Sequence, residues 1–135
     1  MYDYPTAIEL LAAARTHMEQ SVIPALKEPR LRYQTLVAAN VLAIIERELA
    51  TSDAYLVTAS QRLAALLDQE PSSVTGPSLQ AEVAEQTQHL CDQIRAGAYD
   101  EGANRAALFT HLRQTAEDEL HVANPVYLGR FQKTS

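Results

Sequence analysis

The chain has 135 residues, of which 47% are hydrophobic and 21% are charged, and its formal net charge at pH 7 is −6. This length and composition are typical of one globular domain with its own core and exclude a disordered chain. Between residues 51 and 100, seven acidic side chains stand against only two basic ones, Arg62 and Arg95. Because this stretch would repel phosphate groups, we expect no nucleic-acid partner and no anionic membrane partner.

Cysteine content and hydropathy bear on the compartment of the protein. The single cysteine, Cys91, has no partner for an intrachain disulfide, and no secretory signal is recognisable. The longest apolar run, residues 36–45, is interrupted by Asn40 and is far shorter than the roughly 20 residues that span a bilayer. We therefore expect a cytoplasmic protein without a membrane span.

The first two predicted helices cover residues 6–26 and 30–50. Thr6 and Glu9 have the spacing of a capping box at the start of the first helix, and Pro24 predicts a kink near its end. The second helix is apolar around most of its circumference, so we expect it to be the buried centre of the fold.

Three further helices are predicted at residues 53–70, 78–96 and 104–123. Ser52 or Asp53 is a suitable N-cap for the first of these, and Gly97 is a natural C-terminal stop for the second. Asn124 precedes a proline and therefore ends the third, and the apolar tail 126–131 is expected to pack back.

The order of these segments predicts the fold class. Residues of high β-propensity nowhere alternate with polar ones, so no strand is expected. Short connections between successive helices favour antiparallel neighbours. The sequence thus predicts an all-α fold, a single up-and-down bundle of about five helices, with residues 1–135 as one domain. Leu63, Leu66 and Leu67 share one face of the third helix and are expected in the core.

Several polar residues fall on faces that should be buried. At about 100° per residue, Arg15 and Glu19 lie within the apolar arc of the first helix, four residues apart, where they can pair. On the second helix, Glu48 lies on the inner face, with Asn40 and Arg47 at its edge. These five residues form the candidate cluster, either as a polar network that fixes helix register or as a pocket in which Arg15 meets an anionic ligand.

Metal and catalytic chemistry find less support in the sequence. Glu119 also winds inward, but di-iron bundles need Glu-x-x-His pairs, and the sequence contains none. In an antiparallel hairpin, Glu19 and Glu48 would be roughly 15 Å apart along the axis. We therefore expect no metal and no other cofactor, and no set of residues matches a known catalytic motif.

Four segments together resemble a known bacterial family. They are YPTAIELL from Tyr4, VAANVLAIIEREL over residues 37–49, IRAG over 94–97 and ANPVY over 123–127. The family has no established function. The resemblance implies that proteins of this kind are often encoded beside an aminoglycoside-phosphotransferase-like kinase and an acyl-CoA dehydrogenase.

Two hypotheses about function follow. The first, implied by the resemblance, is a non-catalytic accessory or interaction module whose partner is the phosphotransferase-like kinase or the acyl-CoA dehydrogenase; self-association into a homo-oligomer is a further form of such an interaction. The alternative is a small-molecule binding protein for an anionic or acyl-CoA-type ligand, or an unrecognised enzyme, with its pocket at Arg15, Glu19, Asn40 and Glu48.

Overall fold

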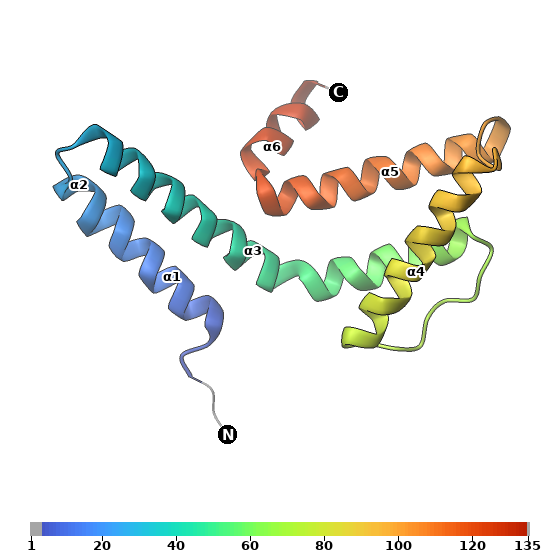
Figure 1. The fold of residues 1–135 in the computed structure, drawn as a ribbon, viewed down its shortest axis with the longest axis horizontal. Coiled ribbons are helices and arrows are strands. Elements are labelled where there is room, and N and C mark those ends of the chain that lie inside the picture. Colours follow the sequence, from blue (N-terminus) through green and yellow to red (C-terminus); the bar gives the residue numbers. More distant parts are fainter. Residues whose placement is uncertain (1–3, 135) are drawn as a thin grey trace. The chain divides into compact units, whose positions relative to one another are not determined.

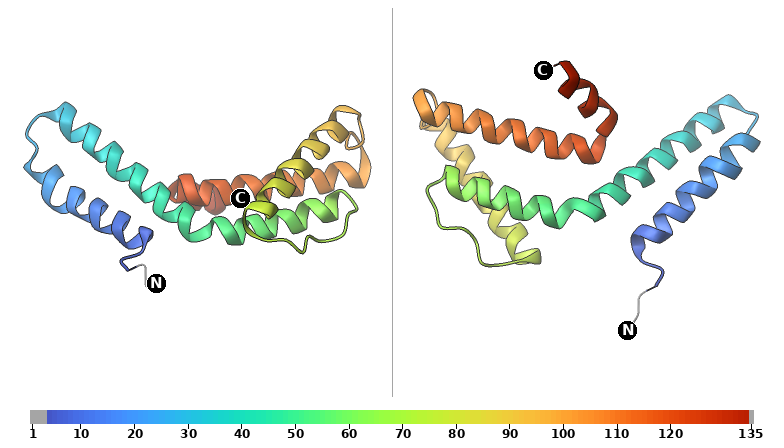
Figure 2. Two further views of the ribbon diagram at one scale, coloured as in Figure 1. Left: turned by 60° about the horizontal axis from the view of Figure 1, so that its bottom comes forward. Right: turned by 180° about the vertical axis from the view of Figure 1, so that it is seen from behind.

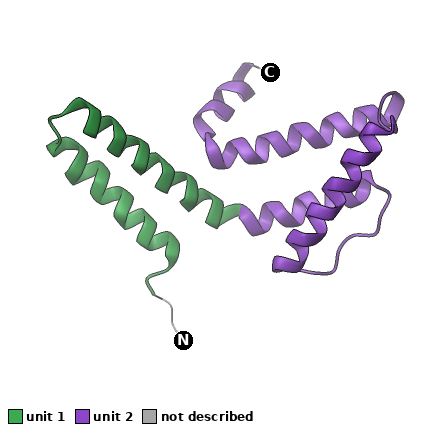
Figure 3. Cartoon of the chain, in the orientation of Figure 1, with its two compact units in different colours: residues 1–51 green, residues 52–135 purple. Residues whose placement is uncertain are grey.

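A computed structural model describes residues 4–134 of the chain (Figure 1). The described residues form helices and no strand, which confirms the all-α prediction. In chain order the elements are α1 (Ala7–His17), the π-helical turn η1 (Met18–Val22), α2 (Ile23–Ala25), α3 (Pro29–Leu66), α4 (Gly76–Arg95), α5 (Gly102–Ala123) and α6 (Pro125–Thr134). By their contacts the residues divide into two compact units, Met1–Thr51 and Ser52–Ser135 (Figure 3).

The first unit is a helical hairpin. Its first arm comprises α1, η1 and α2, and the first half of α3 lies alongside this arm (Figures 1 and 2). The predicted capping box begins α1: the Thr6 hydroxyl accepts a hydrogen bond from the Glu9 backbone N–H at 3.2 Å, and the Glu9 carboxylate accepts one from the Thr6 N–H at 2.7 Å. The start of the first helix is therefore as predicted.

The disturbance expected at Pro24 takes the form of the π turn η1. Proline has no N–H group, and its ring collides with the carbonyl group four residues earlier, here that of Gln20. Within η1 the chain shifts to bonds between residues five apart, as in the bond from the Ile23 N–H to the Met18 carbonyl oxygen. The first helix thus reaches Ala25 by changing its helical type.

The predicted break between the second and third helices is wrong, because α3 runs without interruption from Pro29 to Leu66. No glycine or proline lies between Ala50 and Asp53. Thr51, which neighbours the predicted N-cap, instead donates its hydroxyl to the Arg47 carbonyl oxygen at 2.7 Å. This bond to the preceding turn lets a threonine stay inside a helix.

The expected burial of the second helix is also wrong for most of its large residues. Side chains spaced four apart along the first half of α3 form one exposed row, which we call the α3 ridge. The ridge comprises Tyr33, Val37, Val41, Ile45 and Leu49, which are 37–68% exposed. In the hairpin a single neighbouring arm covers one side of α3, where Ala39 is buried. The residues on the other sides lack a covering helix within the unit.

The second unit contains a hydrophobic core built from three helices. Leu63 of α3, Leu90 of α4, Leu108 of α5 and Tyr99 form its buried centre. The partly buried residues around it are Leu66, Leu67, Val83 and Ile94. The core face predicted for Leu63, Leu66 and Leu67 is therefore confirmed. Tyr99, whose hydroxyl donates to the Leu66 carbonyl oxygen at 3.0 Å, joins the connection between α4 and α5 to α3.

The ends of α4 and α5 follow the sequence signals. Gly97 takes the left-handed conformation after Ala96, the C-cap of α4, with φ of 85°. The tail after Asn124 is the helix α6, which contacts α5 and has Leu128 buried. Among the described residues, no helix is both long and apolar enough to cross a membrane.

Candidate functional site

Arg15 of the first unit lies between two carboxylates. Its Nη1 donates to Glu19 at 3.1 Å, which confirms the predicted pairing across one helical turn. Its Nε and Nη2 donate to Glu46 of α3 at 3.0 and 3.1 Å. The hydrogen bonds that Arg15 donates to Glu46, followed by the one that it donates to Glu19, raise the pKa of the Arg15 guanidinium. Arg15 thus joins the two arms of the hairpin as a permanent cation.

The other predicted residues do not meet Arg15 in this way. Asn40 and Glu48 are exposed on α3, and Arg47 is half-buried and has an interaction of its own. In an antiparallel hairpin, a count of residues outward from the turn places Asn40 level with Arg15. Side chains, however, lean toward the N-terminus of their helix, so Arg15 reaches away from the turn and Glu46 reaches back toward it. The two therefore meet although Glu46 lies more than one turn beyond Asn40.

This arrangement favours the structural interpretation of Arg15. Three of its nitrogens already donate to carboxylates, which leaves the guanidinium little capacity for a further anion. A ligand-binding role for Arg15, Glu19, Asn40, Arg47 and Glu48 stays a prediction.

The second unit contains a groove between α3 and α5, which we call the α3–α5 groove. Its volume is about 400 Å³, and it is lined by Arg62, Ala65, Leu66, Ala107, Thr110, His111 and Gln114. Both carboxylate oxygens of Asp118 accept hydrogen bonds at its edge, one from Arg62 Nη2 at 3.0 Å and the other from Gln114 Nε2 at 3.0 Å. Asp118 therefore fixes the two polar side chains that flank the groove.

His111 and Arg62 leave polar atoms unsatisfied at the groove. His111 Nδ1 and Arg62 Nε are both shielded from solvent, and neither has a hydrogen-bond partner among residues 4–134. Burial, and then the positive charge of Arg62, lower the pKa of the His111 imidazole. At neutral pH the groove therefore combines a neutral imidazole with a cation, next to the apolar side chains Ala65, Leu66 and Ala107.

We expect the stability of the protein to fall at acid pH because of His111. The unfolded chain binds a proton at His111 near pH 6.5, whereas the folded chain binds it only at a lower pH. The free energy of unfolding should therefore decrease as the pH falls from 6.5 through the lower folded pKa. Urea denaturation of His111→Gln between pH 7.5 and 5 should show a weaker pH dependence than that of the wild type. Leu112→Ala, which leaves every titratable group in place, should retain the wild-type dependence, and equal slopes for all three proteins would contradict the assignment.

The sequence reasoning missed this groove, although a signal for it was present. His111, Thr115 and Asp118 follow Leu108 at spacings of three and four, so they share its face of α5. Glu119, which was expected to point inward, is exposed, and its neighbour Asp118 takes the inner position. Adjacent residues differ by about 100° around the helix, so a buried face centred near His111 and Thr115, and not between Leu108 and Leu112, exchanges one for the other.

Comparison with known proteins places the chain in a family without defining its chemistry. No group of three or more His, Cys, Asp or Glu residues in the described part of the chain is arranged to hold a metal ion. No curated protein and no solved structure matches the sequence. A family model described as a domain of unknown function, DUF6285, matches residues 24–127, which is most of the chain. The protein therefore belongs to the DUF6285 family.

Proposed function

We propose that this protein is a cytoplasmic, non-catalytic interaction module that binds a protein partner through the α3 ridge. The observation that supports this proposal is the exposure of five large side chains in a row spaced by four residues. Such a row is one of the ridges with which helices pack into the grooves of other helices. Contiguous apolar surface of this kind is typical of protein–protein contacts.

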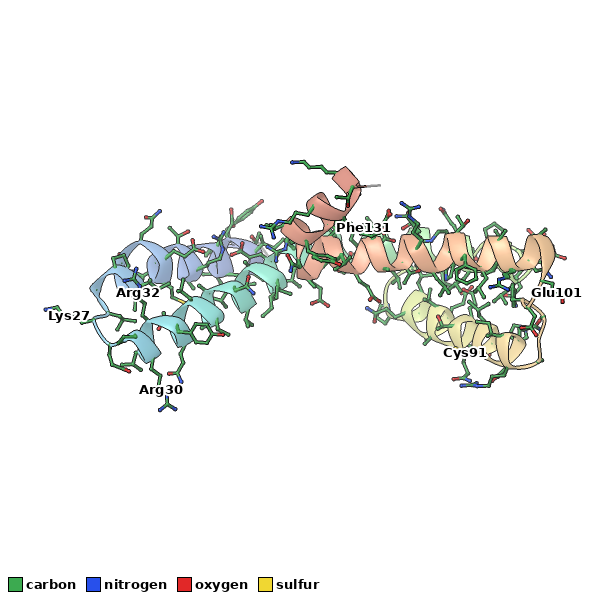
Figure 4. All side chains as sticks on the ribbon, turned by 90° about the horizontal axis from the view of Figure 1, so that it is seen from above. Lys27, Arg30, Arg32, Cys91, Glu101 and Phe131 are labelled. Atoms are coloured by element: carbon green, nitrogen blue, oxygen red, sulfur yellow. The ribbon has the colours of Figure 1, made fainter. Side chains whose placement is uncertain are left out.

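The partner that we propose is the aminoglycoside-phosphotransferase-like kinase, with the acyl-CoA dehydrogenase as its companion in the same assembly. This choice depends on the gene neighbourhood that the sequence resemblance implies. The charges near the two ends of the ridge indicate which charges the partner should carry opposite each end. Lys27 and Arg30 extend from the turn of the hairpin, next to the first residue of the ridge (Figure 4), and Glu48 is exposed next to its last residue, Leu49. We therefore expect acidic groups on the partner near Arg30 and a basic group near Glu48.

Co-expression of the chain with the kinase, followed by size-exclusion chromatography, tests this proposal. The two proteins should elute together at micromolar concentration, and Val41→Glu should abolish the complex because it buries a charge at the centre of the ridge. Since Val41 is half-exposed, the variant should retain the wild-type far-UV circular dichroism spectrum. Ala50→Glu is a matched control: it adds the same charge to α3, but nine residues later and thus on the opposite side of the helix.

Three results would contradict the proposal. Independent elution of the chain and the kinase at micromolar concentration would remove the kinase as partner. Equal loss of binding in Val41→Glu and Ala50→Glu would show that the ridge does not form the contact. If the chain alone forms a homodimer that Val41→Glu abolishes, the ridge serves self-association in place of kinase binding.

A further inference from the structure

We propose that the α3–α5 groove is a binding site for a small monocarboxylate with a short aliphatic body. The inference is independent of the proposed interaction module, because the groove lies in the second unit and the α3 ridge lies in the first. The carboxylate would bind at the Arg62 and His111 end. The aliphatic body would lie on Ala65, Leu66 and Ala107.

Arg62 provides the cation for the carboxylate. Its Nη2 donates to Asp118, and Asp118 is held a second time by Gln114, so the guanidinium is fixed before any ligand arrives. Its Nη1 makes no hydrogen bond within the described structure and is not shielded from solvent. A carboxylate accepts a strong hydrogen bond from such a guanidinium, because the donor is charged. Since the side chain is already held in place, binding costs little further conformational entropy.

His111 provides a second hydrogen-bonding group at the same end. Its Nδ1 is enclosed without a partner, whereas its Nε2, also unpartnered, is open to solvent. Because Nδ1 is enclosed, Nε2 is the imidazole nitrogen that a ligand in the groove can reach. Burial, followed by the charge of Arg62, lowers the pKa of His111, so the imidazole is neutral at neutral pH and lies near the Arg62 cation. A neutral N–H donor next to a guanidinium favours an anion over a cationic ligand.

The remaining walls of the groove determine the rest of the ligand. The side chains of Ala65, Leu66 and Ala107 present only hydrocarbon. The Thr110 hydroxyl donates its hydrogen to the Ala106 carbonyl oxygen at 3.1 Å. A volume of about 400 Å³ lies at the lower end of the range for small-molecule sites. A single fixed cation next to hydrocarbon matches one carboxylate on a short chain. A phosphate ester or a nucleotide would need more donors than the groove contains.

Histidine side-chain NMR of the full chain tests this inference, with sodium butyrate as the ligand and butyramide as its neutral isostere. The signal of His111 is identified by its loss in His111→Gln. Butyrate should shift this signal in a saturable manner and raise the pKa of His111, and butyramide should do neither. Arg62→Gln should bind butyrate at least about tenfold more weakly, since it removes a charge-assisted hydrogen bond.

Two further variants keep the test decisive if Arg62→Gln does not fold. Ala107→Leu extends a side chain into the open groove and should abolish the butyrate shift. Arg113→Gln removes a cation from the same helix outside the groove and should bind as the wild type does. Val41→Glu should also bind butyrate normally, which separates this site from the partner contact.

The inference is wrong if butyramide shifts the His111 signal as strongly as butyrate does. It is also wrong if butyrate shifts all four histidine signals in parallel, or if Ala107→Leu binds butyrate like the wild type.

Discussion

Replacement of Leu63 by alanine is expected to lower the free energy of unfolding by about 2–5 kcal/mol. Leu63 is only 2% exposed and packs in a cluster with Leu90, Tyr99 and Leu108, which belong to separate elements of the second unit. Truncation removes hydrocarbon from this cluster and leaves a cavity that residues anchored on several helices cannot fill by a local shift. Urea denaturation followed by far-UV circular dichroism measures the change as a lower midpoint at an unchanged slope.

Leu112→Ala is the matched control for this prediction. It deletes the same atoms from a leucine of α5 that is 46% exposed, so its effect should remain within about 0.5–1 kcal/mol. A comparable loss of stability in the two variants would mean that Leu63 is not part of a closely packed core.

Replacement of Arg15 by alanine should be the second most destabilising change, at about 1.5–3 kcal/mol. The substitution removes the bonds that join α1 to α3 and leaves Glu46, which is only 15% exposed, without its cation. The effect should fall short of the roughly 3–5 kcal/mol known for fully buried pairs, because water still reaches the Arg15 and Glu19 side chains. Chemical denaturation gives the value, and a double-mutant cycle with Glu46→Ala isolates the pair from the rest of the substitution.

Arg113→Ala separates this effect from that of an ordinary surface ion pair. Arg113 also pairs with a glutamate, Glu117, but its side chain is 65% exposed, and its loss should cost less than about 0.5 kcal/mol. If Arg15→Ala costs no more than Arg113→Ala, Arg15 does not hold the hairpin together.

Local signals in the sequence predicted local structure well. The Thr6–Glu9 capping box, the disturbance at Pro24 and the stop at Gly97 all depend on a few neighbouring residues. The face shared by Leu63, Leu66 and Leu67 was also predictable, because its period is set by the helix itself. The continuation of α3 through Thr51 was not predicted, since the sequence offered an N-cap there, and the absence of any residue that prevents a helix from continuing was given too little weight.

Contacts between helices were harder to predict from the sequence. Glu46, the principal partner of Arg15, is 31 positions away in the chain, and its choice over Asn40 depends on how far and in which direction two long side chains reach. The polar residues of the α3–α5 groove were missed for a related reason. Their meeting requires α5 to lie against α3 in one particular register, which hydrophobic spacing alone does not define.

The π turn lets the first arm contain one additional residue without turning the residues beyond it away from α3. In an unbroken α-helix, the eight steps from Arg15 to Ile23 would rotate by about 800° and leave the two side chains about 80° apart. Since the π turn takes up one additional residue, the same steps close to within about 20°. Buried Ile23 and the Arg15 ion pair can then both face α3. The stretch Met18–Val22 therefore contains one residue more than the packing of the hairpin requires, and a homologue shorter by one residue there would keep the same side of the arm against α3.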